Sequence, residues 1–135
     1  MQTRYADKIV LDGKYVSLEP IDHSHLEEVL DICQPTEIWT YMPYRLISKK
    51  DVSDWIEKAI DRNDQGLDLR FCIRNTMTGQ IVGSTRYLDI SETNRSVEIG
   101  STWLNPTVWR NPINTECKYL LLSHAFETLG TIWVQ

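Results

Sequence analysis

Hydrophobic and polar positions along the chain follow two spacings, one typical of strands and one typical of helices. Residues 8–19 (KIVLDGKYVSLE) alternate apolar and polar side chains around Asp12 and Gly13, a two-residue turn signal, and so predict a hairpin or a kinked first strand. From Ser24 the spacing becomes helical and ends before Pro35, with an apolar face formed by Leu26, Val29, Leu30 and Cys33.

A second helical segment follows a short aromatic one. Residues 38–44 (IWTYMPY) are interrupted by Pro43, which predicts a helical turn followed by an exposed loop. Ser48 and Asp51 have the S-x-x-D spacing that resembles a capping box. The helix that they begin runs to about Arg62, and its apolar face holds Val52, Trp55, Ile56, Ala59 and Ile60.

The second half of the chain is dominated by strand-like segments. Three of them, joined by short polar connections, predict an antiparallel meander: residues 69–74, 81–90 and 96–104. The loop 105–114 then leads to a helix over 115–129, and residues 131–134 predict a strand parallel to the preceding one after a crossover. This order predicts one α/β domain over residues 1–135, with a mixed, mainly antiparallel sheet flanked by helices.

Composition narrows the class of protein. The 135 residues are 41% hydrophobic and carry a formal net charge of -5, which predicts one globular domain that does not bind nucleic acid. No run of 18 apolar residues and no signal-peptide pattern occurs, so we expect a soluble cytoplasmic protein that does not associate with membranes. The three cysteines are far apart and predict reduced core residues, with no metal site.

The strand, loop and helix of the last third form a candidate anion site. A loop that ends at a helix N-terminus presents backbone N–H groups, and the helix dipole favours phosphate there. Arg110 would supply a positive charge, and the candidate N–H donors are Ile113, Asn114, Thr115 and Glu116. The alternative is that Asn114 or Thr115 only caps the helix.

Several motifs, in their order along the chain, resemble the GCN5-related N-acetyltransferase (GNAT) family. Within it the chain is similar to the branch of the ribosomal-protein N-terminal acetyltransferases, RimJ and RimL. The motifs are VSLEP at 16–20, GQIVG at 79–83, SVEIG at 96–100, WLNP at 103–106, NTECKYLLL at 114–122 and HAFE at 124–127. The resemblance runs from about residue 8 to the last residue.

The resemblance implies transfer of an acetyl group from acetyl-coenzyme A, as cosubstrate, to an amine acceptor. It places the pantetheine arm along Ser101, Thr102, Trp103 and Leu104. It places the pyrophosphate over the loop residues Arg110, Asn111, Ile113, Asn114 and Thr115. The family's usual loop contains glycines at this place, whereas here none occurs and Pro112 contributes no N–H.

Glu98 is the candidate catalytic base. Strand alternation places Glu98, Gly100 and Thr102 on one face, and a carboxylate there can accept the proton of an attacking amine. The alternative is that Glu98 is a paired structural carboxylate or an outward-facing residue, and Asp89 is the second candidate for the base. The resemblance further implies an oxyanion donor at a bulge of this strand, near Trp103 or Leu104.

The aromatic segment and the end of the chain provide the remaining expectations. Trp39, Tyr41, Met42 and Tyr44 form either an aromatic wall for the acceptor or an apolar cluster that caps the core. Relatives of this family continue with a further helix and strands, so the chain is expected to be truncated, with an exposed sheet edge that invites a homodimer. The alternative function is a catalytically weak coenzyme A-binding or oligomerising module.

Overall fold

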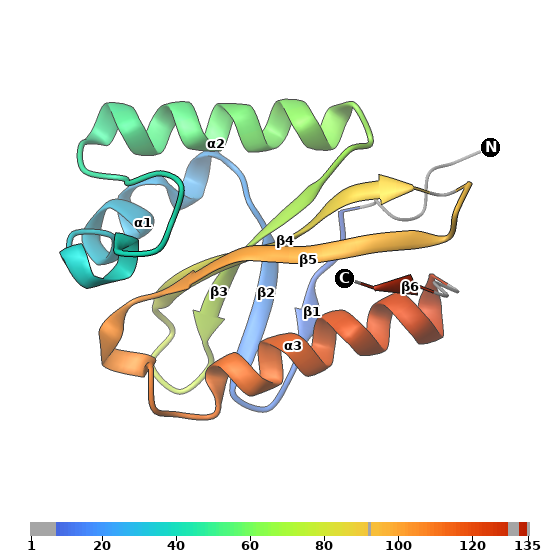
Figure 1. Ribbon diagram of the computed structural model, residues 1–135. Helices are drawn as coiled ribbons and strands as arrows, with labels where there is room; N and C mark the ends of the chain where they lie inside the picture. Colours follow the sequence, from blue (N-terminus) through green and yellow to red (C-terminus); the bar gives the residue numbers. More distant parts are fainter. Residues whose placement is uncertain (1–7, 92, 130–132, 135) are drawn as a thin grey trace.

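A single mixed sheet with helices on both faces organises the fold (Figure 1). A computed structural model of the chain describes residues 8–91, 93–129 and 133–134. The strands are β1 (Leu11–Asp12), β2 (Val16–Pro20), β3 (Leu69–Asn75), β4 (Ile81–Ser91), β5 (Ser96–Leu104) and β6 (Trp133–Val134). The α-helices are α1 (Leu26–Ile32), α2 (Lys49–Asp64) and α3 (Ile113–Ser123). Shorter helical turns are η1 (His23–His25), η2 (Thr36–Trp39), η3 (Pro106–Val108) and the π-helical η4 (His124–Thr128).

The strands lie in the order of the sequence, β1-β2-β3-β4-β5-β6, and neighbours are antiparallel except for the last pair. β6 is parallel to β5, as predicted, and pairs Trp133 with Ser96 and Val134 with Val97. The first two residues of the predicted last strand, Thr131 and Ile132, lie outside the described residues. Because β6 contacts only the start of β5, the described pairing leaves the rest of β5 without a strand on that side.

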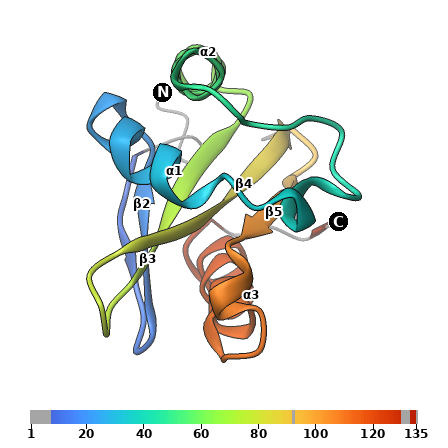
Figure 2. The same ribbon diagram turned by 90° about the vertical axis from the view of Figure 1, so that its left-hand side faces the viewer.

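Two hydrophobic cores cover the two faces of the sheet (Figure 2). The core on the α3 side includes Leu18, Phe71, Ile73, Tyr87, Leu104, Ile113 and Leu121. The core on the opposite side, beneath α1 and α2, includes Val29, Trp39, Val52, Ile56, Cys72 and Trp103. β3 faces apolar residues on both sides, which explains its nearly continuous burial from Leu69 to Ile73.

Several predicted boundaries are confirmed, and one is shifted. The N-terminal hairpin forms with a longer turn than two residues, since Asp12 pairs with Ser17. The capping box of Ser48 and Asp51 begins α2 as predicted. The last helix starts at Ile113, two residues earlier than predicted, because the Asn111 side chain accepts the Ile113 N–H at 2.9 Å.

A β-bulge in β5 changes which of its side chains share a face. Arg86 pairs with Gly100 and Ser84 with Trp103, so two residues of β5 lie opposite Thr85 alone. The extra residue reverses the alternation: Thr102 lies on the face of its hydrogen-bond partner Thr85 (Oγ1 to Oγ1, 2.8 Å), not on that of Glu98. The prediction that Glu98 and Thr102 share a face is therefore wrong.

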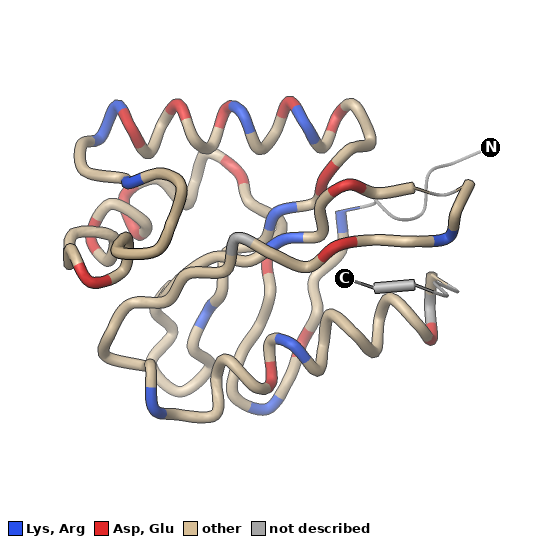
Figure 3. Tube along the Cα trace, in the orientation of Figure 1, with Lys and Arg blue, Asp and Glu red and all other residues tan. Residues whose placement is uncertain are grey.

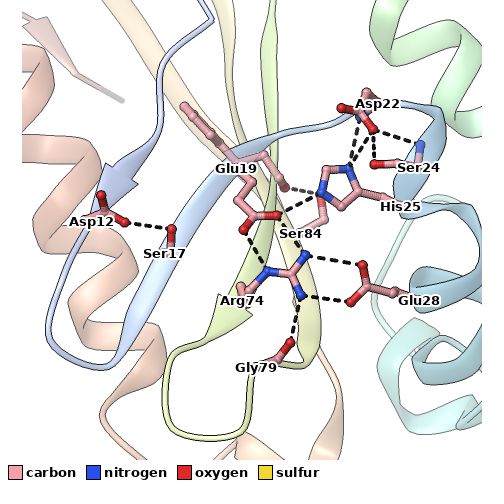
Figure 4. A network of polar contacts seen from close by, with 11 residues as sticks. Asp12, Ser17, Glu19, Asp22, Ser24, His25, Glu28, Arg74, Gly79 and Ser84 are labelled. Atoms are coloured by element: carbon pink, nitrogen blue, oxygen red, sulfur yellow. Dashed lines mark hydrogen bonds and ion pairs between the residues drawn. The ribbon is translucent and has the colours of Figure 1, made fainter.

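A partly buried network ties the first helical region to the sheet (Figure 4). The Arg74 guanidinium donates to both oxygens of Glu19, at 2.7 and 2.9 Å, and to both oxygens of Glu28. The His25 ring lies between Glu19 and the backbone N–H of Asp22. Hydrogen bonding to Arg74, followed by that to His25, lowers the pKa of Glu19 despite its partial burial. This network positions α1 across the sheet on the α2 side.

Candidate active site

A cleft of about 700 Å³ lies beside the second half of β5, where no strand is paired with it in the described structure. Three separate parts of the sequence form its walls. The segment after η2 contributes Tyr41 and Met42, β5 contributes Thr102, Trp103 and Leu104, and α3 contributes Asn114 and Lys118. The cleft thus brings residues predicted for the cosubstrate together with residues predicted for the acceptor.

The predicted cosubstrate residues on β5 differ in exposure. Thr102 is half-buried, whereas Trp103 and Leu104 are buried with part of their surface on the cleft. Ser101 lies on β5, but its side chain is outside the described part of the structure. The backbone of this half of β5 borders the cleft, so the N–H and C=O groups that face away from β4, other than the Leu104 carbonyl bound by Trp109, are available to an extended ligand such as a pantetheine arm.

The loop before α3 supplies fewer N–H donors than the sequence indicates. The Ile113 N–H is already bound by Asn111, and the Glu116 N–H donates to the Pro112 carbonyl at 3.0 Å. Among the described residues, no hydrogen bond occupies the N–H groups of Asn114 and Thr115, which belong to the first turn of α3.

The side chains of this loop have separate places. Arg110, Asn111, Asn114 and Thr115 are exposed, whereas the Ile113 side chain is buried in the core on the α3 side. The exposed cation of Arg110 and the two N–H groups at the helix start fit a phosphate group. Ile113 contributes through its packing and not through a donor.

The predicted acceptor residues separate into core and surface positions. Trp39 is 6% exposed, donates from Nε1 to the Cys33 carbonyl at 2.9 Å and packs against Trp103 with the two rings tilted by 52°. Tyr41 is 97% exposed and, with the half-buried Met42, lines the cleft. Tyr44 packs against Trp39, with ring centroids 5.5 Å apart, and lines a different cavity. Trp39 therefore belongs to the apolar cluster, and the other three reach cavity walls.

Glu98 lies on β5 on the side of the bulge that is closer to β6. The Asp89 carboxyl, which shares a hydrogen bond with Glu98, raises the pKa of Glu98, and partial desolvation adds to this effect. Asp89 comes close because it occupies a second irregularity in the β4–β5 pairing, with a φ of 50°. The structure thus brings together the two carboxylates that the sequence offered as candidate bases.

Two further residues of the cleft were not identified from the sequence. Trp109 lines the cleft and donates from Nε1 to the Leu104 carbonyl at 2.7 Å, which fixes the end of β5. Lys118 lines it from α3, one helical turn after Asn114. The i, i+4 spacing of Asn114 and Lys118 is the signal that indicates one exposed helix face.

The described residues contain no cluster of histidine, cysteine or acidic side chains suited to a metal ion. Cys33, Cys72 and Cys117 are free and buried, as predicted, and burial raises the pKa of Cys117 to about 12. No helix within the described ranges is long and apolar enough to cross a lipid bilayer.

Comparisons with known proteins agree with this fold. The structure of a GCN5-related N-acetyltransferase from Brucella melitensis matches with a TM-score of 0.84 and 24% identity over 93% of this chain. A GNAT acetyltransferase from Bacillus anthracis matches with a TM-score of 0.74 and 14% identity. The match covers 90% of this chain and 69% of that protein. RimL, a ribosomal L7/L12 alpha-N-protein acetyltransferase, matches with a TM-score of 0.78 and 16% identity. The match covers 94% of this chain and 71% of the RimL chain.

The matching proteins are longer than this chain. It spans 57% of the Brucella protein and 60% and 62% of two further acetyltransferase structures. A comparison with curated protein sequences found no match. The family model of the acetyltransferase (GNAT) domain matches residues 16–135, which is most of the sequence. The chain therefore belongs to the GNAT acetyltransferase family, and its fold resembles that of the RimL branch.

Proposed function

We propose that the chain is an N-acetyltransferase that moves the acetyl group of acetyl-coenzyme A to a primary amine. The observation that carries the proposal is the cleft, which joins unpaired β5 backbone to the first turn of α3. The pantetheine arm would lie along residues 101–104, and the pyrophosphate would contact Arg110 and the N–H groups of Asn114 and Thr115. Family membership supports this assignment.

The reaction would proceed by direct attack of the amine in a ternary complex. Glu98, whose pKa is raised by Asp89, would accept the amine proton, directly or through water. A backbone N–H at the β5 bulge would stabilise the carbonyl oxygen as charge develops on it. The acceptor would enter over Tyr41 and Met42.

The proposed acceptor is the N-terminus of a protein or a small amine. The fold of RimL, a ribosomal L7/L12 alpha-N-protein acetyltransferase, supports the first choice. The exposed tyrosine at position 41 supports either one, because its ring is available to a peptide or to a small organic cation.

Titration calorimetry with acetyl-coenzyme A, followed by detection of free thiol in the presence of an amine, tests the proposal. We expect saturable binding with a dissociation constant in the micromolar range, and thiol release that depends on the amine. Desulfo-coenzyme A is the matched ligand for binding without turnover. An absence of saturable binding at millimolar acetyl-coenzyme A would contradict the proposal.

Glu98→Gln is expected to lower kcat roughly tenfold or more, because the amide cannot accept the amine proton. The affinity for acetyl-coenzyme A should change less than about twofold, since Glu98 lies away from the predicted pyrophosphate contacts. Asp89→Asn is the matched variant of the neighbouring carboxylate. Normal turnover in Glu98→Gln, with a loss in Asp89→Asn, would assign the base to Asp89 instead.

A second candidate is a coenzyme A-binding or oligomerising module with little turnover. It is favoured by the described pairing of β5, whose second half has no strand on the side away from β4 and could take one from another chain. Binding of acetyl-coenzyme A without amine-dependent thiol release would favour this candidate. The homodimer through the sheet edge beside β6 stays a prediction of both candidates.

A further inference from the structure

A second cavity, of about 390 Å³, lies beneath α2 on the face of the sheet opposite α3. Its walls include Tyr44, Trp55, Arg62, Asp68, Arg70 and Arg86. Figure 3 shows Lys and Arg positions in the strands beneath α2 and alternating charges along α2 itself. Neither the predicted cosubstrate contacts nor the candidate base uses this cavity.

Arg70 is the most deeply buried cation of the cavity. It is 5% exposed, and its guanidinium carbon lies 5.1 Å from the centre of the Trp55 ring. Its Nη1 donates to the Ser84 hydroxyl at 2.9 Å, and that hydroxyl donates onward to a backbone carbonyl. Burial lowers the pKa of Arg70 to about 10, so the side chain is still charged at neutral pH.

The carboxylates that line the cavity are bound to groups other than Arg70. Asp68 binds Arg62 and Arg86. Asp51 accepts the N–H groups that begin α2, and Asp54 pairs with Lys50, which lies outside the cavity. Among the described residues, Arg70 forms no direct ion pair, although the charge of Asp68 is close enough to favour its charged form. A buried cation without a partner is costly, and an anionic ligand would remove that cost.

A row of residues across the sheet leads from Arg70 toward the candidate base Glu98. Arg70 pairs with Arg86 across β3 and β4, and Arg86 pairs with Gly100 of β5, so the three form one row on the α2 side. Strands lie about 4.8 Å apart, so Arg70 is about 10 Å from Gly100. Glu98 lies two residues along β5 on the same face as Gly100.

Three observations indicate that the row of Arg70, Arg86 and Gly100 is not closed to further groups. The Nε of Arg86 is buried and has no hydrogen-bond partner, although its Nη1 binds Asp68 at 3.1 Å. Asp89 raises the pKa of Glu98, and Arg86 is close enough to oppose this effect. Gly100 ends the row and has no side chain, so no side chain of this residue lies between Arg86 and the β5 backbone.

We infer that this cavity binds a carboxylate of the acyl acceptor, so that the acceptor is an amine with a carboxylate about 12 Å from its nitrogen, which is the separation of two strand spacings and two residues along β5. Arg70 binds the carboxylate while the amine lies at Glu98. A carboxylate matches the buried guanidinium of Arg70, which has no direct ion pair, in charge and in planar shape. This inference rests on the proposed acetyl transfer for the role of the amine. The carboxylate site itself is inferred from the burial and contacts of Arg70.

The test compares 8-aminooctanoate with its neutral amide. The wild-type chain should prefer the acid, and Arg70→Met should lower the ratio of kcat/KM for acid over amide about tenfold or more. Methionine keeps the contact with Trp55 but removes the charge. Arg70→Lys, which keeps the charge but not the planar fork, should give an intermediate ratio.

Lys49→Met is the matched control, because it removes the same charge from the start of α2, outside the cavity. It should leave the preference for the acid unchanged. Binding of 8-aminooctanoate to the chain without acetyl-coenzyme A, measured by calorimetry, should be lost in Arg70→Met. Near-ultraviolet circular dichroism verifies that each variant is folded, and if Arg70→Met is not, the Arg70→Lys ratio decides.

Equal use of the acid and the amide by the wild-type chain would overturn the inference. An unchanged preference in Arg70→Met would do the same, as would a preference for an aminoalkyl phosphate over the acid. Failure of the proposed function has a different signature: acetyl-coenzyme A would not bind, while binding of 8-aminooctanoate would still depend on Arg70.

Discussion

Gly83→Ala is expected to lower the free energy of unfolding by about 3 kcal/mol. A Cβ at this position on β4 would lie 2.1 Å from the carbonyl oxygen of Trp103 and 3.0 Å from the Cα of Leu104. Both atoms belong to the backbone of β5, so no side-chain rotation relieves the clash and the two strands must separate. Urea denaturation followed by circular dichroism measures the loss.

The same substitution should weaken the binding of acetyl-coenzyme A, because Trp103 and Leu104 line the cleft. Gly100→Ala on the paired strand is the matched control. Its Cβ would meet only the Cδ2 of Leu88, at 3.3 Å, and this side chain can move. The control should change stability by less than about 0.5 kcal/mol. Equal stabilities of the two variants would contradict the assigned role of Gly83.

The elements of this fold that depend on local signals could be predicted from the sequence. Ser48 and Asp51 are three residues apart and satisfy each other's backbone, so the start of α2 is encoded within one turn. Likewise, β4 and β5 follow from apolar stretches separated by a short polar connection. The parallel placement of β6 required only that α3 cross the sheet between two strands.

The bulge in β5 could not be predicted because it is a property of a pair of strands. Nothing within residues 96–104 shows that two of them lie opposite Thr85, so regular alternation placed Thr102 beside Glu98. The contact of Glu98 with Asp89 has the same origin, since Asp89 is at an irregularity on the partner strand. Both features bear on the predicted chemistry of the site.

Arg70 was overlooked for a different reason. Residues 69–73 (LRFCI) form a strand that is buried on both faces, and such strands carry no alternation to interpret. The available signal was the arginine itself, because a charged residue inside an otherwise apolar strand is almost never fully buried unless it has a partner. The sequence could not show that the nearby carboxylates are already engaged, since those contacts come from α2 and from the β3–β4 pairing.

The helix start beside the cleft was predicted to within two residues, and its hydrogen bonding was only partly foreseen. Four N–H groups were candidates, but Asn111 and the Pro112 carbonyl engage two of them. The side chain of Glu116 has a separate role that the sequence did not reveal. It accepts the backbone N–H groups of Lys14, Tyr15 and Val16 at 3.0, 2.6 and 2.8 Å. The first turn of α3 is thus fastened to the hairpin of β1 and β2.

Glu116→Ala is expected to lower the free energy of unfolding by about 3 kcal/mol, because three backbone donors lose a charged acceptor. Glu116→Gln should cost about half as much, since one amide oxygen can still accept two of the three bonds. Glu127→Ala, an exposed acidic residue in η4, is the control and should change stability by less than about 0.5 kcal/mol.

The loss in Glu116→Ala should extend to the cleft, because Glu116 follows directly on the N–H groups of Asn114 and Thr115 that are proposed to hold the pyrophosphate. We therefore expect weaker binding of acetyl-coenzyme A at a temperature where the variant is still folded, measured by calorimetry. The affinity for pantetheine, the fragment of coenzyme A without phosphate groups, should change little, since that fragment does not reach the helix start. If acetyl-coenzyme A binds equally well to Glu116→Ala and to the wild-type chain, the position of the first turn of α3 is not set by this carboxylate, and the contact stabilises the hairpin alone.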